Sequence, residues 1–255
     1  MVLSEITVLL GVLALVSLGV CLIHKHWPYT KRKEHNDVAG FVFAGIGVMY
    51  GVLLAFVVII GWEGLSSART ITYTEADQLA DVYWMSRSLP SPQGPAIQGL
   101  ALQYAHAVIR NEWPQMEKDE TSSQAQLILD QMRADVFGFT PRSDQQEALY
   151  DQELASVNAL SAARRDRLVA MNETIPEPMW IVLIIGGVIT VGFCLLFGLP
   201  NKIVHVGIVA ALAVLITMSL LLVKNMQYPF AGDPHIGPEA FEIFLSQASQ
   251  WHQVG

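Results

Sequence analysis

Hydrophobic positions gather in two pairs of long apolar runs, one pair near each end of the chain, separated by a polar segment. The four runs cover residues 6–23, 38–62, 179–199 and 203–223. Each run is long enough to cross the ~30 Å hydrocarbon layer of a bilayer as a helix, and none contains Asp, Glu, Lys or Arg. The pattern predicts an all-α membrane protein in which four transmembrane helices form two hairpins, with a helical-bundle insert between spans two and three.

The polar insert shows no alternating strand pattern and is interrupted by proline-containing breaks. We expect span two to continue as one long helix until the break that begins at Leu89, since no helix breaker precedes it. Three further helices are expected, over residues 96–112 with an end at Trp113-Pro114, over residues 122–138, and from Thr140-Pro141 to Asn172. With short loops between them, these helices predict an up-and-down bundle.

The C-terminal segment places Phe241, Phe244 and Leu245 at helical spacing after Gly237-Pro238. This pattern predicts a short amphipathic helix that lies on the membrane surface or docks against the base of the bundle. The expected domains are a first transmembrane hairpin, an extramembrane helical bundle, a second transmembrane hairpin and this amphipathic segment, over residues 1–62, 63–177, 178–224 and 225–255.

Composition agrees with membrane burial, because 52% of the residues are hydrophobic and only 15% are charged. The net charge of -8 arises almost entirely in the insert, which argues against a nucleic-acid partner. The chain carries no phosphate-binding loop, dinucleotide fingerprint, nucleophile elbow or zinc-protease helix. We therefore expect neither enzymatic activity nor a cofactor.

The loop between the first two spans is basic, whereas only Glu5 is charged before span one. The basic residues of this loop are Lys25, Lys31, Arg32 and Lys33. By the positive-inside rule the loop faces the cytoplasm, so both termini and the insert are expected on the outer side.

Span two carries small residues on one helical face, namely Gly40, Ala44, Gly47, Gly51 and Ala55. Such a face lets another helix approach closely. The opposite face carries Val42, Met49, Leu53 and Phe56. In a monomer that face would meet lipid, whereas in a ring of subunits it could line an apolar constriction that gates ions by dewetting.

Charged residues of the insert form a second group of candidates. Glu75 and Arg164 are each expected roughly 20 Å beyond the membrane boundary, at a rise of ~1.5 Å per residue, and could therefore pair. A basic cluster consists of Arg164, Arg165 and Arg167. Its arginines could form salt bridges to Glu75, Asp77 or Asp81. Alternatively, they could form a ring that concentrates anions at a pore mouth. Asp81 and Glu112 are expected to be solvated or to lie at helix ends.

Four histidines, His24, His26, His35 and His205, are expected on one side of the membrane, but their spacing is not that of a metal site. We interpret them as interfacial residues and predict no metal. Cys21 and Cys194 lie in apolar runs and are interpreted as small residues of helix interfaces.

A set of short motifs extends over nearly the whole chain. It comprises His35-Asn36, Gly40, Gly47-Val48, Tyr50, Leu54-Ala55-Phe56, Trp62-Glu63, Glu75-Ala76, Glu112-Trp113-Pro114, Arg164 to Arg167, Pro176, Trp180, Pro229-Phe230 and Gly232. The set resembles the bacterial family called bestrophin-like. The resemblance implies kinship with bestrophins, pentameric anion channels whose second membrane helix lines an apolar neck and whose helical domain is inserted between two membrane hairpins. It also implies a multi-pass protein of the bacterial inner membrane. The basic loop would then place the termini and the insert in the periplasm, whereas bestrophins keep the insert in the cytosol.

We expect a homo-oligomeric, anion-conducting channel that lies in the lipid bilayer and conducts small anions. The resemblance implies that its subunits form a pentamer. Span two would line the pore, and its pore or packing face consists of Gly40, Phe41, Ala44, Gly47, Met49, Gly51 and Phe56. The alternative is a non-conducting membrane protein whose external bundle binds a partner protein or senses envelope conditions. The charge-free spans and the acidic insert favour this alternative.

Overall fold

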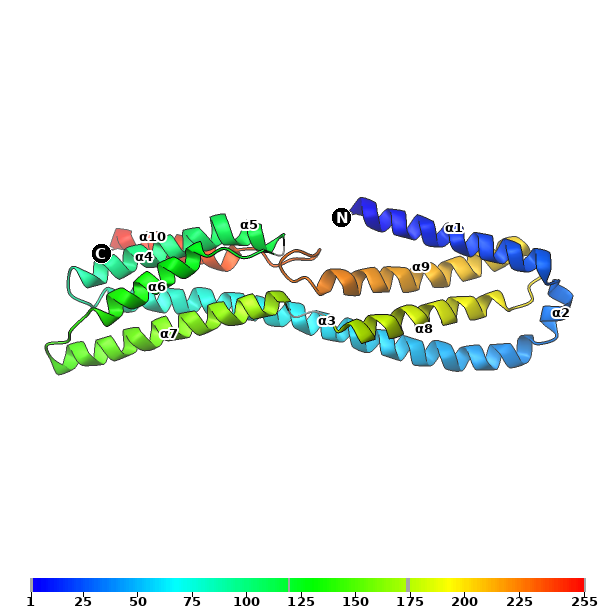
Figure 1. The fold of residues 1–255 in the computed structure, drawn as a ribbon, viewed down its shortest axis with the longest axis horizontal. Coiled ribbons are helices and arrows are strands. Elements are labelled where there is room, and N and C mark those ends of the chain that lie inside the picture. Colours follow the sequence, from blue (N-terminus) through cyan, green and yellow to red (C-terminus); the bar gives the residue numbers. More distant parts are fainter. Residues whose placement is uncertain (1, 119, 173–174, 255) are drawn as a thin grey trace. The chain divides into compact units, whose positions relative to one another are not determined.

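The computed structural model describes residues 2–118, 120–172 and 175–254, and every regular element within them is a helix (Figure 1). The elements are α1 (Val2–His26), α2 (Tyr29–Lys33), α3 (Asn36–Ser86), α4 (Gln93–Ala107), the π-helix η1 (Val108–Glu112), α5 (Trp113–Met116), α6 (Gln124–Phe137), α7 (Asp144–Asn172), α8 (Glu177–Leu195), α9 (Lys202–Met226) and α10 (Glu239–Val254). Four helices of the described residues are long and apolar enough to cross a membrane, and they contain α1, α3, α8 and α9. The all-helical class and the four candidate spans are thus confirmed.

The chain divides into two compact units. The first, called here the membrane unit, comprises Met1–Trp62 and Thr174–Asn225, and the second, called the bundle unit, comprises Glu63–Glu173 and Met226–Gly255. The boundary between Trp62 and Glu63 falls within α3, so this 51-residue helix contributes to both units. As expected, span two continues without interruption into a long polar helix.

Helices α3 and α8 of the membrane unit are in contact at Tyr50. The Tyr50 hydroxyl donates a hydrogen bond to the Leu183 carbonyl at 3.1 Å. A Cβ atom at Gly186 would lie 2.7 Å from the Tyr50 ring, and one at Gly187 would lie 3.0 Å from its hydroxyl. The two glycines of α8 are therefore needed for this contact, because any larger residue would meet the ring.

The loops at the basic end of the membrane unit are interlocked. Arg32 is 1% exposed, and its guanidinium donates to the carbonyls of Leu195 at 3.1 Å and Phe197 at 2.8 Å. Asn36 exchanges two hydrogen bonds with the Gly198 backbone, at 2.8 and 3.1 Å. Arg32, predicted as a topology-determining loop charge, thus also satisfies carbonyls at the C-terminal end of α8, where a positive charge is favourable.

The bundle unit packs α4, α6, α7, α10 and the polar part of α3 around one apolar core (Figure 1).

The predicted helix end at Trp113-Pro114 is wrong, because the chain continues through η1 into α5 as far as Met116. Pro114 lies in the first turn of α5, where its missing N–H is not needed. The predicted start of the next long helix at Thr140-Pro141 is also too early. This helix, α7, begins at Asp144, where the Ser143 hydroxyl accepts a hydrogen bond from the Gln146 N–H at 3.3 Å.

The C-terminal helix α10 docks in the bundle unit. Phe241 and Ala248 are fully buried and Phe244 is 2% exposed. Phe241 packs against Trp113 and Tyr104, with ring centroids 6.0 and 6.5 Å apart. Of the two positions that the sequence allowed for this helix, its aromatic face therefore occupies the bundle core.

Candidate functional site

The core of the bundle unit contains a network of four charged side chains from α3, η1 and α7. Arg167 Nε lies 2.5 Å from Glu75 Oε2, and Arg167 Nη2 lies 2.8 Å from Glu112 Oε1. Arg164 Nη1 lies 2.7 Å from Glu112 Oε2. Glu75, Glu112 and Arg167 are fully buried and the Arg164 side chain is 3% exposed. Two arginines and two glutamates thus balance one another away from water, as buried charges require.

Aromatic and sulfur atoms enclose this network. The Tyr104 hydroxyl donates to Glu75 Oε1 at 2.5 Å, and the Arg167 guanidinium donates to Met116 Sδ at 2.8 Å. The same guanidinium lies 5.1 Å from the centroid of the Trp113 ring. Trp113 is itself held by a hydrogen bond from its Nε1 to the Ile236 carbonyl at 3.1 Å. The segment that leads into α10 therefore helps to close the network.

The surroundings of the network shift the pKa values of Arg167 and Tyr104. Burial works to lower the pKa of Arg167, but Glu75 and Glu112 outweigh that effect and raise the pKa overall. Burial, together with Glu75, raises the pKa of Tyr104 well above its usual value, so the phenol remains a donor. Within the described residues, the four charged groups form their ion pairs with one another, so the arrangement suits a rigid structural element better than a catalytic one.

Sequence reasoning identified the participants of this network only in part. The predicted salt bridge to Glu75 exists, but it comes from Arg167, whereas Arg164 pairs with Glu112. Asp77 and Asp81 are exposed. Glu112 is fully buried, so its interpretation as a solvated residue is wrong, although it is the last residue of η1. The signal that could have found it is its place before Trp113-Pro114, where the π-turn points it into the core.

Glu153 of α7 is a further buried carboxyl that the sequence analysis did not single out. Both of its carboxylate oxygens lack a hydrogen-bond partner within the described residues, and the side chain is fully buried. Burial raises the pKa of Glu153 to about 8. At neutral pH the protonated form therefore predominates, which avoids an unpaired buried charge.

The predicted pore or packing residues of span two are largely uncovered. Phe41, Met49 and Phe56 are 84%, 78% and 62% exposed, and Ala44 and Gly51 are exposed as well. No atom lies within 4 Å of the Cβ position at Gly47 or Gly51, while that of Gly40 lies 3.9 Å from Phe197. Within the described residues, no neighbouring side chain packs against Gly47 or Gly51, so the packing of this face against another helix stays a prediction, and a contact between α3 and α8 lies at Tyr50 and the α8 glycines.

Two of the four histidines, His24 and His205, form a hydrogen-bonded pair. His205 Nε2 donates to the Cys194 carbonyl at 3.1 Å, which leaves His205 Nδ1 to accept from His24 Nε2 at 3.0 Å. His26 Nδ1 lies 2.9 Å from the Leu22 carbonyl. Within the part of the chain that the structure describes, no three His, Cys, Asp or Glu side chains are close enough to hold a metal ion.

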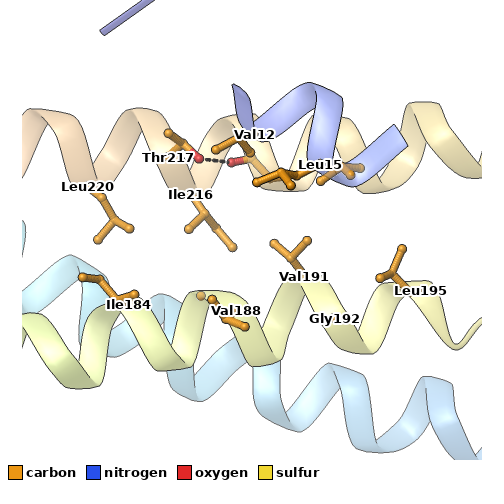
Figure 2. Close-up of a pocket in the computed structure, with 13 residues that line it drawn as sticks. Val12, Leu15, Ile184, Val188, Val191, Gly192, Leu195, Ile216, Thr217 and Leu220 are labelled. Carbon is orange, nitrogen blue, oxygen red and sulfur yellow. Dashed lines mark hydrogen bonds between the residues drawn. The ribbon is translucent and has the colours of Figure 1, made fainter. Parts of the chain in front are cut away.

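An apolar cavity of about 350 Å³ lies within the membrane unit between α1, α8 and α9 (Figure 2). Val12, Leu15, Ile184, Val188 and Leu220 are among its lining residues. The hydroxyl of Thr217, which also lines the cavity, donates to the Ala213 carbonyl at 2.7 Å. Because its lining is almost entirely hydrocarbon, the cavity suits apolar groups better than an ion.

Four apolar helices in one unit and an ion-paired helical bundle in the other define an all-helical membrane protein of the bestrophin fold. The family model described as the bestrophin-like domain matches residues 10–241. The chain belongs to this family.

Two solved structures are similar to the chain. One is a variant of a bacterial bestrophin homologue from Klebsiella pneumoniae, with 13% identity, a TM-score of 0.65, and coverage of 94% of this chain and 98% of that chain. The other is a variant described as a membrane protein, with 13% identity, a TM-score of 0.66, and coverage of 94% and 96%. At this identity the similarity shows a shared fold. No curated protein sequence matches the chain.

Proposed function

We propose that the chain is the subunit of a homo-oligomeric, anion-conducting channel in which the membrane segment of α3 lines the pore. The observation that carries the proposal is the uncovered apolar face of this segment, on which Phe41, Val48 and Met49 are 84%, 67% and 78% exposed. The four spans contain no Asp, Glu, Lys or Arg in their interiors, so one chain alone offers no polar path for an ion. Conduction therefore requires several subunits around an axis, and membership of the family supports a pentamer.

The two flanks of this face suit two different roles. Ala44, Gly51 and Ala55 are small and exposed, and they would allow the helix of a neighbouring subunit to approach closely. Met49 and Phe56 lie on the other flank, where bulky apolar side chains would form a constriction that excludes water until the helices move apart. This division assigns packing to the glycine flank and gating to the Phe56 flank.

The bundle unit would contribute less positive charge than its three clustered arginines suggest. Arg164 and Arg167 are neutralised by Glu112 and Glu75. Arg165 is exposed and has no ion pair within the described residues. Arg165 is accordingly the member of the cluster that we assign to attracting anions, with the other two as structural residues.

The test is an anion flux assay on the purified full-length protein in liposomes. Chloride flux together with a ring-shaped oligomer in detergent is the expected result. Arg165→Gln should lower the anion-to-cation permeability ratio, and Arg142→Gln, at an exposed position outside the arginine cluster, serves as the charge-matched control. An intact oligomer that passes neither anions nor cations would reject conduction and leave the alternative, a bundle that binds a partner protein or senses envelope conditions.

A further inference from the structure

A polar cavity of about 170 Å³ lies within the bundle unit between α6 and α7. Its polar lining residues are Gln126 and Arg133 from α6, and Ser161, Arg164 and Arg165 from α7. The spacing explains why they meet, because residues three, four or seven positions apart lie on one face of a helix. This volume is well above the space that a single water molecule needs, so a small polyatomic anion can enter.

The polar groups of this cavity, called here the α6–α7 pocket, are held in place before any ligand arrives. Arg133 Nη2 donates to Ser161 Oγ at 2.5 Å, and Ser161 Oγ donates in turn to the Val157 carbonyl at 2.9 Å. Arg164 Nε donates to Gln126 Oε1 at 3.2 Å. The side chain of Ser161 is buried and that of Arg164 is 3% exposed, so both are fixed by their surroundings.

The charge balance of the α6–α7 pocket is positive. Arg164 is neutralised, because Glu112 accepts two of its hydrogen bonds. Arg133 has one acidic neighbour, Asp130, at 3.8 Å, and that side chain is 54% exposed. Arg165 has no acidic partner within the described residues. One positive charge is thus left uncompensated, and both Arg133 and Arg165 retain guanidinium donors that are not used within the protein.

We propose that the α6–α7 pocket binds a small anion whose charge lies on oxygen atoms, of the phosphate, sulfate or carboxylate class. Guanidinium groups bind such oxygens through paired, charge-assisted hydrogen bonds, a geometry that a spherical halide does not match. The Ser161 hydroxyl donates to the Val157 carbonyl, and the Gln126 amide accepts from Arg164 and donates to Asp130 at 2.9 Å. These neutral groups therefore position the pocket, and the guanidinium donors of Arg133 and Arg165 are left for the anion. The pocket is therefore a ligand site of the bundle unit, and it does not depend on conduction through α3.

Calorimetric titration of the full-length protein in detergent tests this site, with inorganic phosphate as one probe and succinate as the other. The total ionic strength is held constant by adjusting sodium chloride, so that a simple screening effect cancels. Saturable binding of one or both probes is expected, and the pair of probes distinguishes a tetrahedral oxyanion from a carboxylate. The double variant Arg133→Gln/Arg165→Gln should weaken binding about tenfold or more, the loss typical of a charge-assisted hydrogen bond.

Arg142→Gln provides the matched control, because Arg142 is exposed and lies outside the pocket. It removes the same type of charge from the same unit and should leave the affinity unchanged. If the double variant does not fold, the single variant Arg165→Gln keeps the test valid, since Arg165 is exposed. Absence of saturable binding for both probes, or equal affinity in the wild type and the Arg165→Gln variant, would overturn the proposal. Because the readout is binding, it stands or fails separately from the liposome flux.

Discussion

Arg167 of α7 and Glu75 of α3 form an ion pair in which both side chains are completely buried, with Nε 2.5 Å from Oε2. A buried pair contributes little net stability compared with apolar residues, but removal of one member leaves the other charge unpaired in a medium of low polarity. This asymmetry makes the pair a sensitive probe of the bundle unit.

Glu75→Gln should destabilise the protein by about 3–5 kcal/mol, the range measured when one partner of a buried ion pair is removed. Thermal unfolding in detergent, monitored by circular dichroism, measures the change. Asp77→Asn is the control, because Asp77 lies two positions away on α3 and is exposed. Equal melting temperatures for the two variants would contradict the assignment of the network as a structural element.

Gly186→Ala should destabilise the membrane unit, whereas Gly192→Ala should be tolerated. The added methyl group at Gly186 would meet the Tyr50 ring at 2.7 Å, while no atom lies within 4 Å of the Cβ position at Gly192. Overpacking of this kind typically costs about 1–3 kcal/mol. Melting temperatures of the two variants in the same detergent decide the matter, and a loss of stability at Gly192 as large as that at Gly186 would refute the Tyr50 contact.

Glu153 predicts a pH dependence of stability with a defined sign. Its pKa is raised to about 8 in the folded protein from an ordinary value of 4.5, so the folded state holds the proton more tightly than the unfolded state. Its contribution to stability is therefore fully present below pH 4.5, declines as the pH rises from there to about 8, and stays lost above that value.

Glu153→Gln tests this expectation, because the amide cannot ionise. The wild type should lose stability relative to the variant across this interval, by up to ~1.4 kcal/mol for each unit of pKa shift. Denaturant unfolding at several pH values provides the measurement. Parallel curves for the two proteins would show that Glu153 does not titrate with a raised pKa.

Gly51→Leu should weaken assembly of the oligomer, because a bulky side chain on the small flank of α3 keeps a neighbouring helix at a distance. Gly11→Leu is the control. Both glycines are exposed and have no atom within 4 Å of the Cβ position, but Gly11 belongs to α1. Size-exclusion chromatography with light scattering reports the oligomer. Identical oligomer sizes for both variants would argue against packing through this flank.

The sidedness predicted from the basic loop can be tested with two engineered cysteines in a background that lacks Cys21 and Cys194. Thr30 lies in the basic loop segment and Gln124 lies at the start of α6, and both residues are exposed. On intact cells with a permeabilised outer membrane, an impermeant thiol reagent should label Gln124→Cys and spare Thr30→Cys. The reverse pattern would place the bundle unit in the cytoplasm.

Sequence alone determined the helical class and the four candidate spans, because hydrophobic length is a local property that the bilayer thickness converts directly into a span. It also predicted the uninterrupted continuation of α3 and the helix that follows Pro238, since breakers and helix-starting residues act within a few positions of the chain.

Tertiary structure decided which charges meet. Arg164 and Arg165 are adjacent in sequence, yet a helix turns by ~100° per residue, so Arg164 is buried against Glu112 while Arg165 stays exposed at the α6–α7 pocket. Glu75 and Arg167 are 92 positions apart, and only the rotation of α3 against α7 selects this pair over Asp77 or Arg164. The docking of α10 was likewise undetermined by its amphipathic pattern, because an apolar face fits a membrane surface or a protein core equally well. The aromatic residues of the bundle core supplied the surface that it covers.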